Sequence, residues 1–103
     1  MKKFTNEQIF EFLMLISEEL KVFIPFSKRM EIYNLYKETY SEKSTPNIRL
    51  PKYVLEGVKE SDIKDFENKY GLMVLNSYNY DFIMFLDIDN FLTFLKIIGK
   101  NDE

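Results

Sequence analysis

The acidic string at residues 87–90 is the part of the sequence that most resembles a chemical motif. In the string Asp87-Ile88-Asp89-Asn90, Asp87 and Asp89 have the spacing with which a calcium-binding loop begins, where carboxylate and amide oxygens coordinate the ion. That loop also needs an oxygen ligand, a glycine and a glutamate at three later positions, and this chain has apolar residues at all three. The string also resembles the Asp-x-Asp motif of metal–nucleotide sites, which belongs to much larger folds. We therefore interpret Asp87 or Asp89 as the cap of a helix, because a short carboxylate accepts the free amide hydrogens at a helix start.

Pairs of carboxylates that could perform acid–base hydrolysis are the next candidates. Asp81 with Asp87, or Glu56 with Glu60, could supply the acid and the base, but with 17 acidic residues some pair will always lie close. The chain has no cysteine and no histidine, and its three glycines stand apart. It therefore lacks a thiol nucleophile, a near-neutral proton shuttle and a phosphate-cradling glycine loop. We predict a protein that is not an enzyme, with no catalytic residue, cofactor or metal site, and keep a small carboxylate-dependent hydrolase as the least favoured alternative.

Three tyrosines at helical spacing form the first candidate for an interaction surface. Tyr33, Tyr36 and Tyr40 fall on one side of a predicted helix, beside its core-facing residues. Tyrosine is common at interaction hot spots because it buries a large area at little entropic cost and keeps a hydroxyl group for hydrogen bonding. The competing interpretation, which we favour, places these rings at the boundary of the core.

The C-terminal quarter carries a local excess of acid. Residues 79–103 contain five acidic residues against two lysines, a local charge of −3. Such a surface could occupy a basic groove of another protein by electrostatic complementarity, and a solvated acidic rim explains the same pattern. The full set of candidate interaction residues adds the following to the three tyrosines above: Tyr78, Tyr80, Asp81, Asp87 and Asp89.

A surface for nucleic acid is the second functional hypothesis, because basic side chains interleaved with aromatic rings suit single strands. Four basic residues near the tyrosines in the sequence could supply that mixture: Lys28, Arg29, Arg49 and Lys52. Three glutamates on an adjacent face would repel phosphate: Glu31, Glu38 and Glu42. The whole chain has a net charge of −3, whereas nucleic-acid-binding domains are usually basic. We therefore do not favour nucleic acid as a partner, and keep a nucleic-acid-associated accessory protein as the alternative function.

Length and composition indicate one domain with its own core. Hydrophobic residues make up 46% and aromatic residues 17% of the 103 positions. A chain of this length can bury roughly two-thirds of its unfolded surface. We expect a single compact domain over residues 1–103, frayed at 1–4 and 100–103. Lysine is preferred over arginine and alanine is absent, a bias that matches AT-rich codons.

The stretch from Leu72 to Ile98 is the part around which the rest of the chain is organised. Leu72–Leu75 and Phe82–Leu86 are apolar runs that predict two strands of a hairpin, joined by turn-prone residues. Because the second run is uninterrupted, we expect both of its faces to be covered. An apolar face at helical spacing then predicts a helix to Ile98, ended by Gly99.

The first forty residues predict two helices. Thr5 and Gln8 fit a capping box for a helix that runs to about Phe23, before Pro25. The expected core face of this helix ends with Leu20 and Phe23. The first half of this helix is apolar nearly all round, which predicts burial on several sides or an interface. Ser27 is the expected cap of a second helix over residues 28–40.

The middle of the chain is less regular. Residues 41–51 predict a loop with two prolines, in which Ile48–Leu50 could pair as an edge strand. Residues 52–58 fit either a strand or a helical turn, and Ser61 is the expected cap of a helix over 62–70 that ends before Gly71. The predicted fold is α+β: an N-terminal helix pair, a short middle helix, a small antiparallel β-hairpin or three-stranded sheet, and a C-terminal helix.

The predicted function is a non-enzymatic protein–protein interaction module. The chain has more apolar and tyrosine side chains than so short a core needs, which favours docking on a larger partner protein. Phages and other mobile elements often encode small acidic regulators and inhibitors that act in this way. Self-association is a related hypothesis. No run reaches the roughly 18 apolar residues of a membrane span and no secretory signal is visible, so we expect a cytoplasmic protein without a membrane partner.

Overall fold

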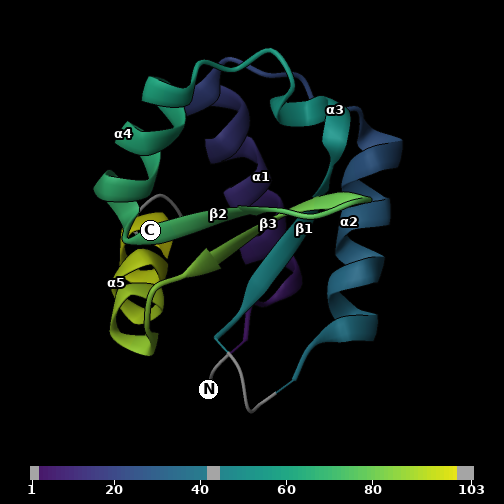
Figure 1. Ribbon diagram of the computed structural model, residues 1–103. Helices are drawn as coiled ribbons and strands as arrows, with labels where there is room; N and C mark the ends of the chain where they lie inside the picture. Colours follow the sequence, from purple (N-terminus) through teal and green to yellow (C-terminus); the bar gives the residue numbers. More distant parts are fainter. Residues whose placement is uncertain (1–2, 42–44, 100–103) are drawn as a thin grey trace.

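Residues 3–41 and 45–99 are described by a computed structural model of the chain (Figure 1). Its elements follow in the order α1 (Asn6–Leu20), α2 (Phe26–Thr39), β1 (Asn47–Pro51), α3 (Lys52–Leu55), α4 (Glu60–Tyr70), β2 (Leu72–Asn76), β3 (Tyr80–Phe85) and α5 (Ile88–Gly99). The α+β fold predicted from the sequence is confirmed, with helices at both ends and three strands between residues 47 and 85.

The sheet has three antiparallel strands in the order β1-β3-β2. Ile48 pairs with Ile83 on one side of β3, and Val74 pairs with Ile83 on the other, so the central strand is held by both neighbours. The predicted edge strand between the prolines is therefore confirmed. The ambiguous stretch that follows is helical over Lys52–Leu55, because β1 ends at Pro51 and this proline starts the turn.

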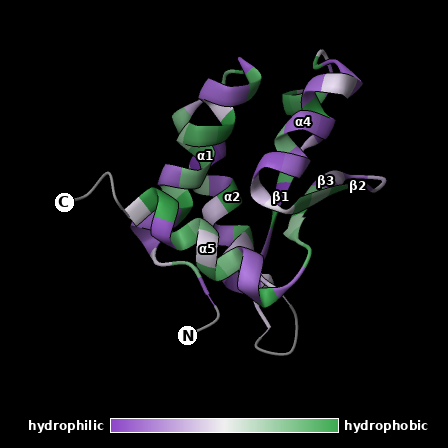
Figure 2. Cartoon of the chain, turned by 90° about the vertical axis from the view of Figure 1, so that its left-hand side faces the viewer, coloured by the Kyte–Doolittle hydropathy of each residue, from purple (hydrophilic) through white to green (hydrophobic). Residues whose placement is uncertain are grey.

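Only one face of the sheet is covered by helices. Residues along β3 alternate between partly exposed and buried, with Ile83 and Phe85 buried and Phe82 and Met84 half-buried. In Figure 1 α1 lies behind the sheet and no helix lies in front of it; seen from the side in Figure 2, no helix lies beyond the strands. The expectation that both faces of this apolar run are covered is wrong. An uninterrupted run indicates that both sets of side chains are apolar, which does not require that both are buried.

Helix α1 is the centre of the packing, as its all-round apolar sequence predicted. It contacts α2, α4 and α5, and its residues Phe12, Leu13 and Ile16 have no exposed surface. The predicted capping box is present: the amide of Gln8 donates to Thr5 Oγ1 at 3.2 Å, and the amide of Thr5 donates to Gln8 Oε1 at 2.9 Å.

The end of α1 differs from the prediction. The helix stops at Leu20, where Lys21 takes a left-handed conformation with φ 55° and its amide donates to the carbonyl of Ser17. The chain therefore turns early, Ile24 is buried, and Phe23, which was expected on the core face, is 75% exposed.

The predicted serine caps of the next two long helices are also wrong. Helix α2 begins at Phe26 after Pro25, and α4 begins at Glu60 after Lys59, in both cases without a side-chain cap. In α2 the carbonyl of Pro25 accepts the amides of Lys28 and Arg29. Proline presets the dihedral angle that a helix start requires, so the chain enters the helix before the serine is reached.

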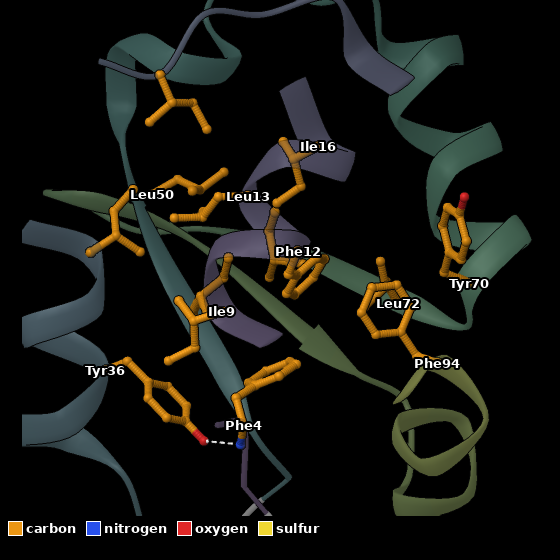
Figure 3. Close-up of a cluster of buried hydrophobic side chains, with 14 of the residues drawn as sticks. Phe4, Ile9, Phe12, Leu13, Ile16, Tyr36, Leu50, Tyr70, Leu72 and Phe94 are labelled. Carbon is orange, nitrogen blue, oxygen red and sulfur yellow. Dashed lines mark hydrogen bonds between the residues drawn. The ribbon is translucent and has the colours of Figure 1, made fainter. Parts of the chain in front are cut away.

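The core between α1 and the sheet combines aromatic rings with aliphatic side chains (Figure 3). Phe85 of β3 lies 5.2–5.9 Å, ring to ring, from Phe12, Phe91 and Phe94, and its pair with Phe91 is edge-to-face. Aromatic pairs of favourable geometry add about 0.5–1.5 kcal/mol each to the gain from the area that they bury. Phe4 joins the cluster at 4% exposure, so the fraying expected for residues 1–4 does not extend to Phe4; residues 1–2 and 100–103 lie outside the described residues.

A polar contact joins the far end of α1 to α4. Glu19 accepts hydrogen bonds from Lys69 Nζ and from the Tyr70 hydroxyl, both at 2.8 Å. These bonds, first that of Lys69 and then that of Tyr70, lower the pKa of the Glu19 carboxyl below its usual value. Burial and the same carboxylate raise the pKa of the Tyr70 hydroxyl.

The junction of α4, β2 and α5 depends on a glycine. Gly71 ends α4 in the left-handed region with φ 66°, and a side chain at this position would collide with the amide of Asn90. Asn90 in turn is held by Asp87, whose carboxylate accepts its backbone amide at 2.8 Å and its side-chain amide at 3.0 Å. The predicted acidic cap of α5 is therefore Asp87. Gly99, the expected terminator, is the last residue of the helix.

Candidate interaction surface

The uncovered face of the sheet is the largest apolar surface that the strands leave to solvent. Its side chains are those that alternate with the buried ones, and we call the following set the open face: Arg49, Met73, Leu75, Tyr80, Phe82, Met84 and Leu86. Leu75 is 41% exposed and Leu86 56% exposed, while Phe82 and Met84 lie half-buried between their neighbours. Contiguous exposed apolar surface of this kind marks interaction sites in soluble proteins, because it costs solubility unless something covers it.

The register of the strands makes the open face continuous across the sheet. Met73 stands opposite Met84, and Leu75 stands opposite Phe82, so four apolar side chains form a two-by-two block on β2 and β3. On the other side of β3, Arg49 is paired with Phe82 and its guanidinium lies 4.9 Å from the centre of that ring. The open face is therefore an apolar block with a single cation at one margin, among the described residues of the strands.

Two exposed aromatic side chains lie at the beginning of α2, Phe23 just before it and Phe26 as its first residue, and we call this pair the aromatic corner. Tyr53 of α3 is a third exposed ring. Phe23 is 75% exposed, Phe26 71% and Tyr53 45%. The turn that carries Phe23 is fixed on both sides, because Ile24 is buried and its carbonyl accepts a hydrogen bond from Arg29 Nε at 2.9 Å. Exposed rings on a fixed turn lose little entropy when a partner covers them.

Lys28 lies in the first turn of α2, two residues after Phe26. Its ammonium donates to Glu31 at 3.1 Å, and this hydrogen bond is the main reason that the pKa of Lys28 is raised. The ammonium is therefore already paired within α2.

The outer edge of β2 is partly closed. The backbone amide of Val74, on the free side of this edge strand, donates to Glu67 of α4 at 2.8 Å. A free strand edge invites pairing with another chain, and a side chain that occupies an edge amide works against it. The face of the sheet, rather than its β2 edge, is therefore the surface that the strands offer to a partner.

The tyrosines of α2 lie at the margin of the core, as the favoured interpretation proposed. Tyr33 is 9% and Tyr36 5% exposed, and Tyr40 is half-buried. The hydroxyl of Tyr36 accepts the backbone amide of Phe4 at 2.9 Å, and burial raises the pKa of this phenol. The hydroxyls of Tyr33 and Tyr36 hold the N-terminal segment by hydrogen bonds, and all three tyrosines line a cleft between that segment and α2.

The five other candidate residues are separated in the structure. Tyr78, at the tip of the β2–β3 hairpin, is 94% exposed. Asp81 is 5% exposed on the covered face of β3, where it accepts a hydrogen bond from Lys52 at 2.9 Å, so it does not contribute to a surface as expected. Asp87 and Asp89 are exposed in the first turn of α5, where Asp87 is used as a cap. The structure brings none of these acids into one acidic patch with the tyrosines of α2.

The four basic residues of the nucleic-acid hypothesis each have a partner within the chain. Lys28 pairs with Glu31 and Lys52 with Asp81. Arg29 donates to the carbonyl of Ile24, and Arg49 lies over the ring of Phe82. A phosphate backbone would have to compete with these partners.

The residues that matter most for this surface were not singled out from the sequence. Leu75 and Met73 belonged to a run expected to be covered, and Phe23 was expected in the core. The helical periodicity of residues 9–24 fits Phe23 and Ile24 almost equally well, so the sequence contained no cue that decided between them. The alternation along β3 is visible only once the pairing of the strands is known.

Comparison with known protein families, characterised proteins and solved structures gives no match. In residues 3–41 and 45–99, no helix is both long and apolar enough to cross a membrane. Within the same ranges, no three acidic, histidine or cysteine side chains gather where they could hold a metal ion.

Proposed function

We propose that this protein is an interaction module that docks on a larger partner protein through the open face of its sheet, and that it acts as a regulator or inhibitor of that partner without chemistry of its own. The observation that carries the proposal is the apolar block of Met73, Leu75, Phe82 and Met84 on a sheet face that no described helix covers.

The gain from covering the open face can be estimated from its exposed side chains. A fully buried leucine or methionine side chain gains about 1.5–3 kcal/mol over an exposed one. Leu75 and Met73 are 41% and 37% exposed, so covering what remains of each yields about 1 kcal/mol per residue. A standard interface buries about 800 Å² on each partner. The open face alone is a modest area, so the partner must also cover surface beyond it, for which the exposed rings of Phe23 and Phe26 are candidates.

Self-association through the same face is the nearest alternative occupant, since two copies could place their apolar blocks against each other. The apolar sequence of α1 gives this alternative little support, because that helix packs against α2, α4 and α5 of its own chain and only Met14 among its large apolar side chains is mostly exposed, at 52%. Light scattering at high protein concentration measures the mass of the particle in solution, and a mass near the 12.5 kDa of one chain would exclude self-association.

Site-specific photocrosslinking in the native host tests the proposal. A photoreactive phenylalanine analogue replaces Leu75 on the open face, or Leu92 on α5 as the matched control, since both leucines are 41% exposed. We expect a covalent adduct to one protein species from position 75 and none from position 92. Equal adducts from both positions would mean that the open face has no preference for a partner.

The identified partner is then titrated against purified variants. Leu75→Glu places a charge in the middle of the proposed contact and should weaken binding at least about tenfold, the typical cost of a disrupted hot spot. Leu92→Glu should leave the affinity within about twofold. Both side chains are partly exposed, so both variants should fold, which circular dichroism checks. An unchanged Kd for Leu75→Glu would refute the proposal.

A further inference from the structure

A cleft separate from the open face runs between the N-terminal segment and α2. Its volume is ≈ 700 Å³, within the range of small-molecule sites. We call it the tyrosine cleft, and its lining residues on α2 are Tyr33, Tyr36, Lys37 and Tyr40. The opposite wall is formed by residues 3–7 and Ile9, at the beginning of α1.

The walls of the tyrosine cleft are tied together by two hydrogen bonds. The Tyr33 hydroxyl donates to Asn6 Oδ1 at 2.6 Å, and the Phe4 amide donates to the Tyr36 hydroxyl at 2.9 Å. Tyr36 is therefore an acceptor in its bond, and its own hydroxyl proton is not used in that contact although the residue is 5% exposed. A buried donor of this kind is available to an acceptor that enters the cleft.

Two ammonium groups lie at the cleft. Lys37 Nζ is 5.1 Å from the centre of the Tyr33 ring, and Lys3 Nζ is 5.8 Å from that of Tyr40. Within the described part of the chain, neither has a carboxylate at ion-pair distance, unlike Lys28, Lys52 and Lys69. Cation–π contact with the rings restricts the positions of the two ammonium groups but, unlike an ion pair, does not neutralise their charge.

The start of α1 adds further donors on the same side. Thr5 caps the helix by accepting the amide of Gln8, and the first-turn amides of Asn6 and Glu7 have no carbonyl partner within a helix by virtue of their position. Such amides and the positive end of the helix dipole favour an anion. The Glu7 carboxylate also lines the cleft and opposes an anion, so the described lining carries two positive charges against one negative.

We infer that the tyrosine cleft binds a phosphomonoester with a flat aromatic body, the chemical class of a mononucleotide. The donors on both walls outnumber what a carboxylate can accept, whereas a phosphate presents three oxygens and nearly two negative charges. The remaining lining is apolar: the buried side chains of Phe4 and Ile9 form part of the wall, and the half-buried ring of Tyr40 is the most accessible aromatic surface for a planar group attached to the phosphate. This inference is independent of the open face.

A nuclear magnetic resonance titration of the full chain tests the inference with three probes: adenosine monophosphate, adenosine and inorganic phosphate. We expect saturable shifts of the backbone amides of Asn6, Glu7 and Lys37 with the monophosphate. Its affinity should exceed that of either half-probe by at least about threefold, since each half lacks the contacts of the other. A monophosphate that binds no more tightly than both half-probes, or shifts that fall elsewhere, would overturn the inference.

Charge variants provide the matched controls. Lys37→Gln and Lys3→Gln should each weaken the monophosphate by about threefold, the scale of a partly exposed ion pair, and Glu7→Gln should tighten it. Lys96→Gln removes an exposed lysine on α5, outside the cleft, and should change nothing. An equal effect of Lys96→Gln and Lys37→Gln would show that net charge alone is responsible, and would also overturn the inference.

Discussion

Replacing Gly71 with alanine should destabilise the fold in two separable ways. The residue has φ 66°, and for a side-chain-bearing residue the left-handed region costs about 1–2 kcal/mol. An added Cβ would also collide with the side-chain amide of Asn90, and forcing atoms into a filled site costs about 1–3 kcal/mol. We therefore expect Gly71→Ala to lower the free energy of unfolding by about 2–5 kcal/mol in total.

The second contribution can be removed by shortening the neighbour. Asn90→Ala deletes the colliding amide, and leaves a Cβ at 3.0 Å from the added one, a distance that a small shift relieves. Asn90→Ala alone costs the side-chain hydrogen bond to Asp87, about 1 kcal/mol. In the Asn90→Ala background, Gly71→Ala should therefore cost only the backbone part, about 1–2 kcal/mol.

Urea denaturation followed by far-ultraviolet circular dichroism measures all four proteins of this cycle. We expect the double variant to be at least about 1 kcal/mol more stable than the sum of the two single effects predicts. A cost of less than about 0.5 kcal/mol for Gly71→Ala would contradict both contributions. Strictly additive effects would contradict the collision with Asn90.

Three further predictions concern polar contacts. Lys52→Met leaves the carboxylate of Asp81 buried without its partner, and should lower the free energy of unfolding by about 1–3 kcal/mol, measured by urea denaturation. Asp81→Asn in the same background should recover part of this loss. An unchanged urea midpoint for Lys52→Met would contradict the prediction. The lowered pKa of Glu19 means that the native state favours the charged carboxylate more than the unfolded chain does. Its contribution to stability is therefore present above the usual pKa of 4.5 and is lost as the pH falls from there through the lower native-state pKa. Lys69→Met should flatten the pH dependence of stability in this acidic range, and an identical profile would exclude the contact as its source. Thr5→Ala removes the capping box and should lower the free energy of unfolding by about 1 kcal/mol, measured in the same way; a Thr5→Ser variant, which retains the hydroxyl, should lose much less.

The features that the sequence predicts well are those with a local physical cause. The capping box of Thr5 needs only two side chains three residues apart, and the acidic cap before α5 needs only Asp87 beside an apolar periodic segment. The short strand between two prolines is found for the same reason, since Ile48 and Leu50 alternate with polar neighbours.

The features that escape prediction depend on contacts between distant segments. Whether Phe82 is covered depends on where five helices pack, and no local pattern contains that information. Lys21 ends α1 in a left-handed conformation that lysine rarely adopts, so the expected continuation to Phe23 followed the ordinary rule and was wrong. The tyrosine cleft was missed because its wall includes Lys3 and Phe4, which belong to a segment expected to fray.

The central position of α1 has a consequence during synthesis. This helix leaves the ribosome before α5, which is one of the surfaces that it needs. About 80 residues separate the ends of the two helices, so at translation speeds of about 5–20 residues per second the nascent chain carries an apolar helix without this cover for roughly four to sixteen seconds. A holdase chaperone that recognises apolar helical segments is therefore expected to bind residues 9–20 of the unfinished chain and to release them when the C-terminal helix emerges.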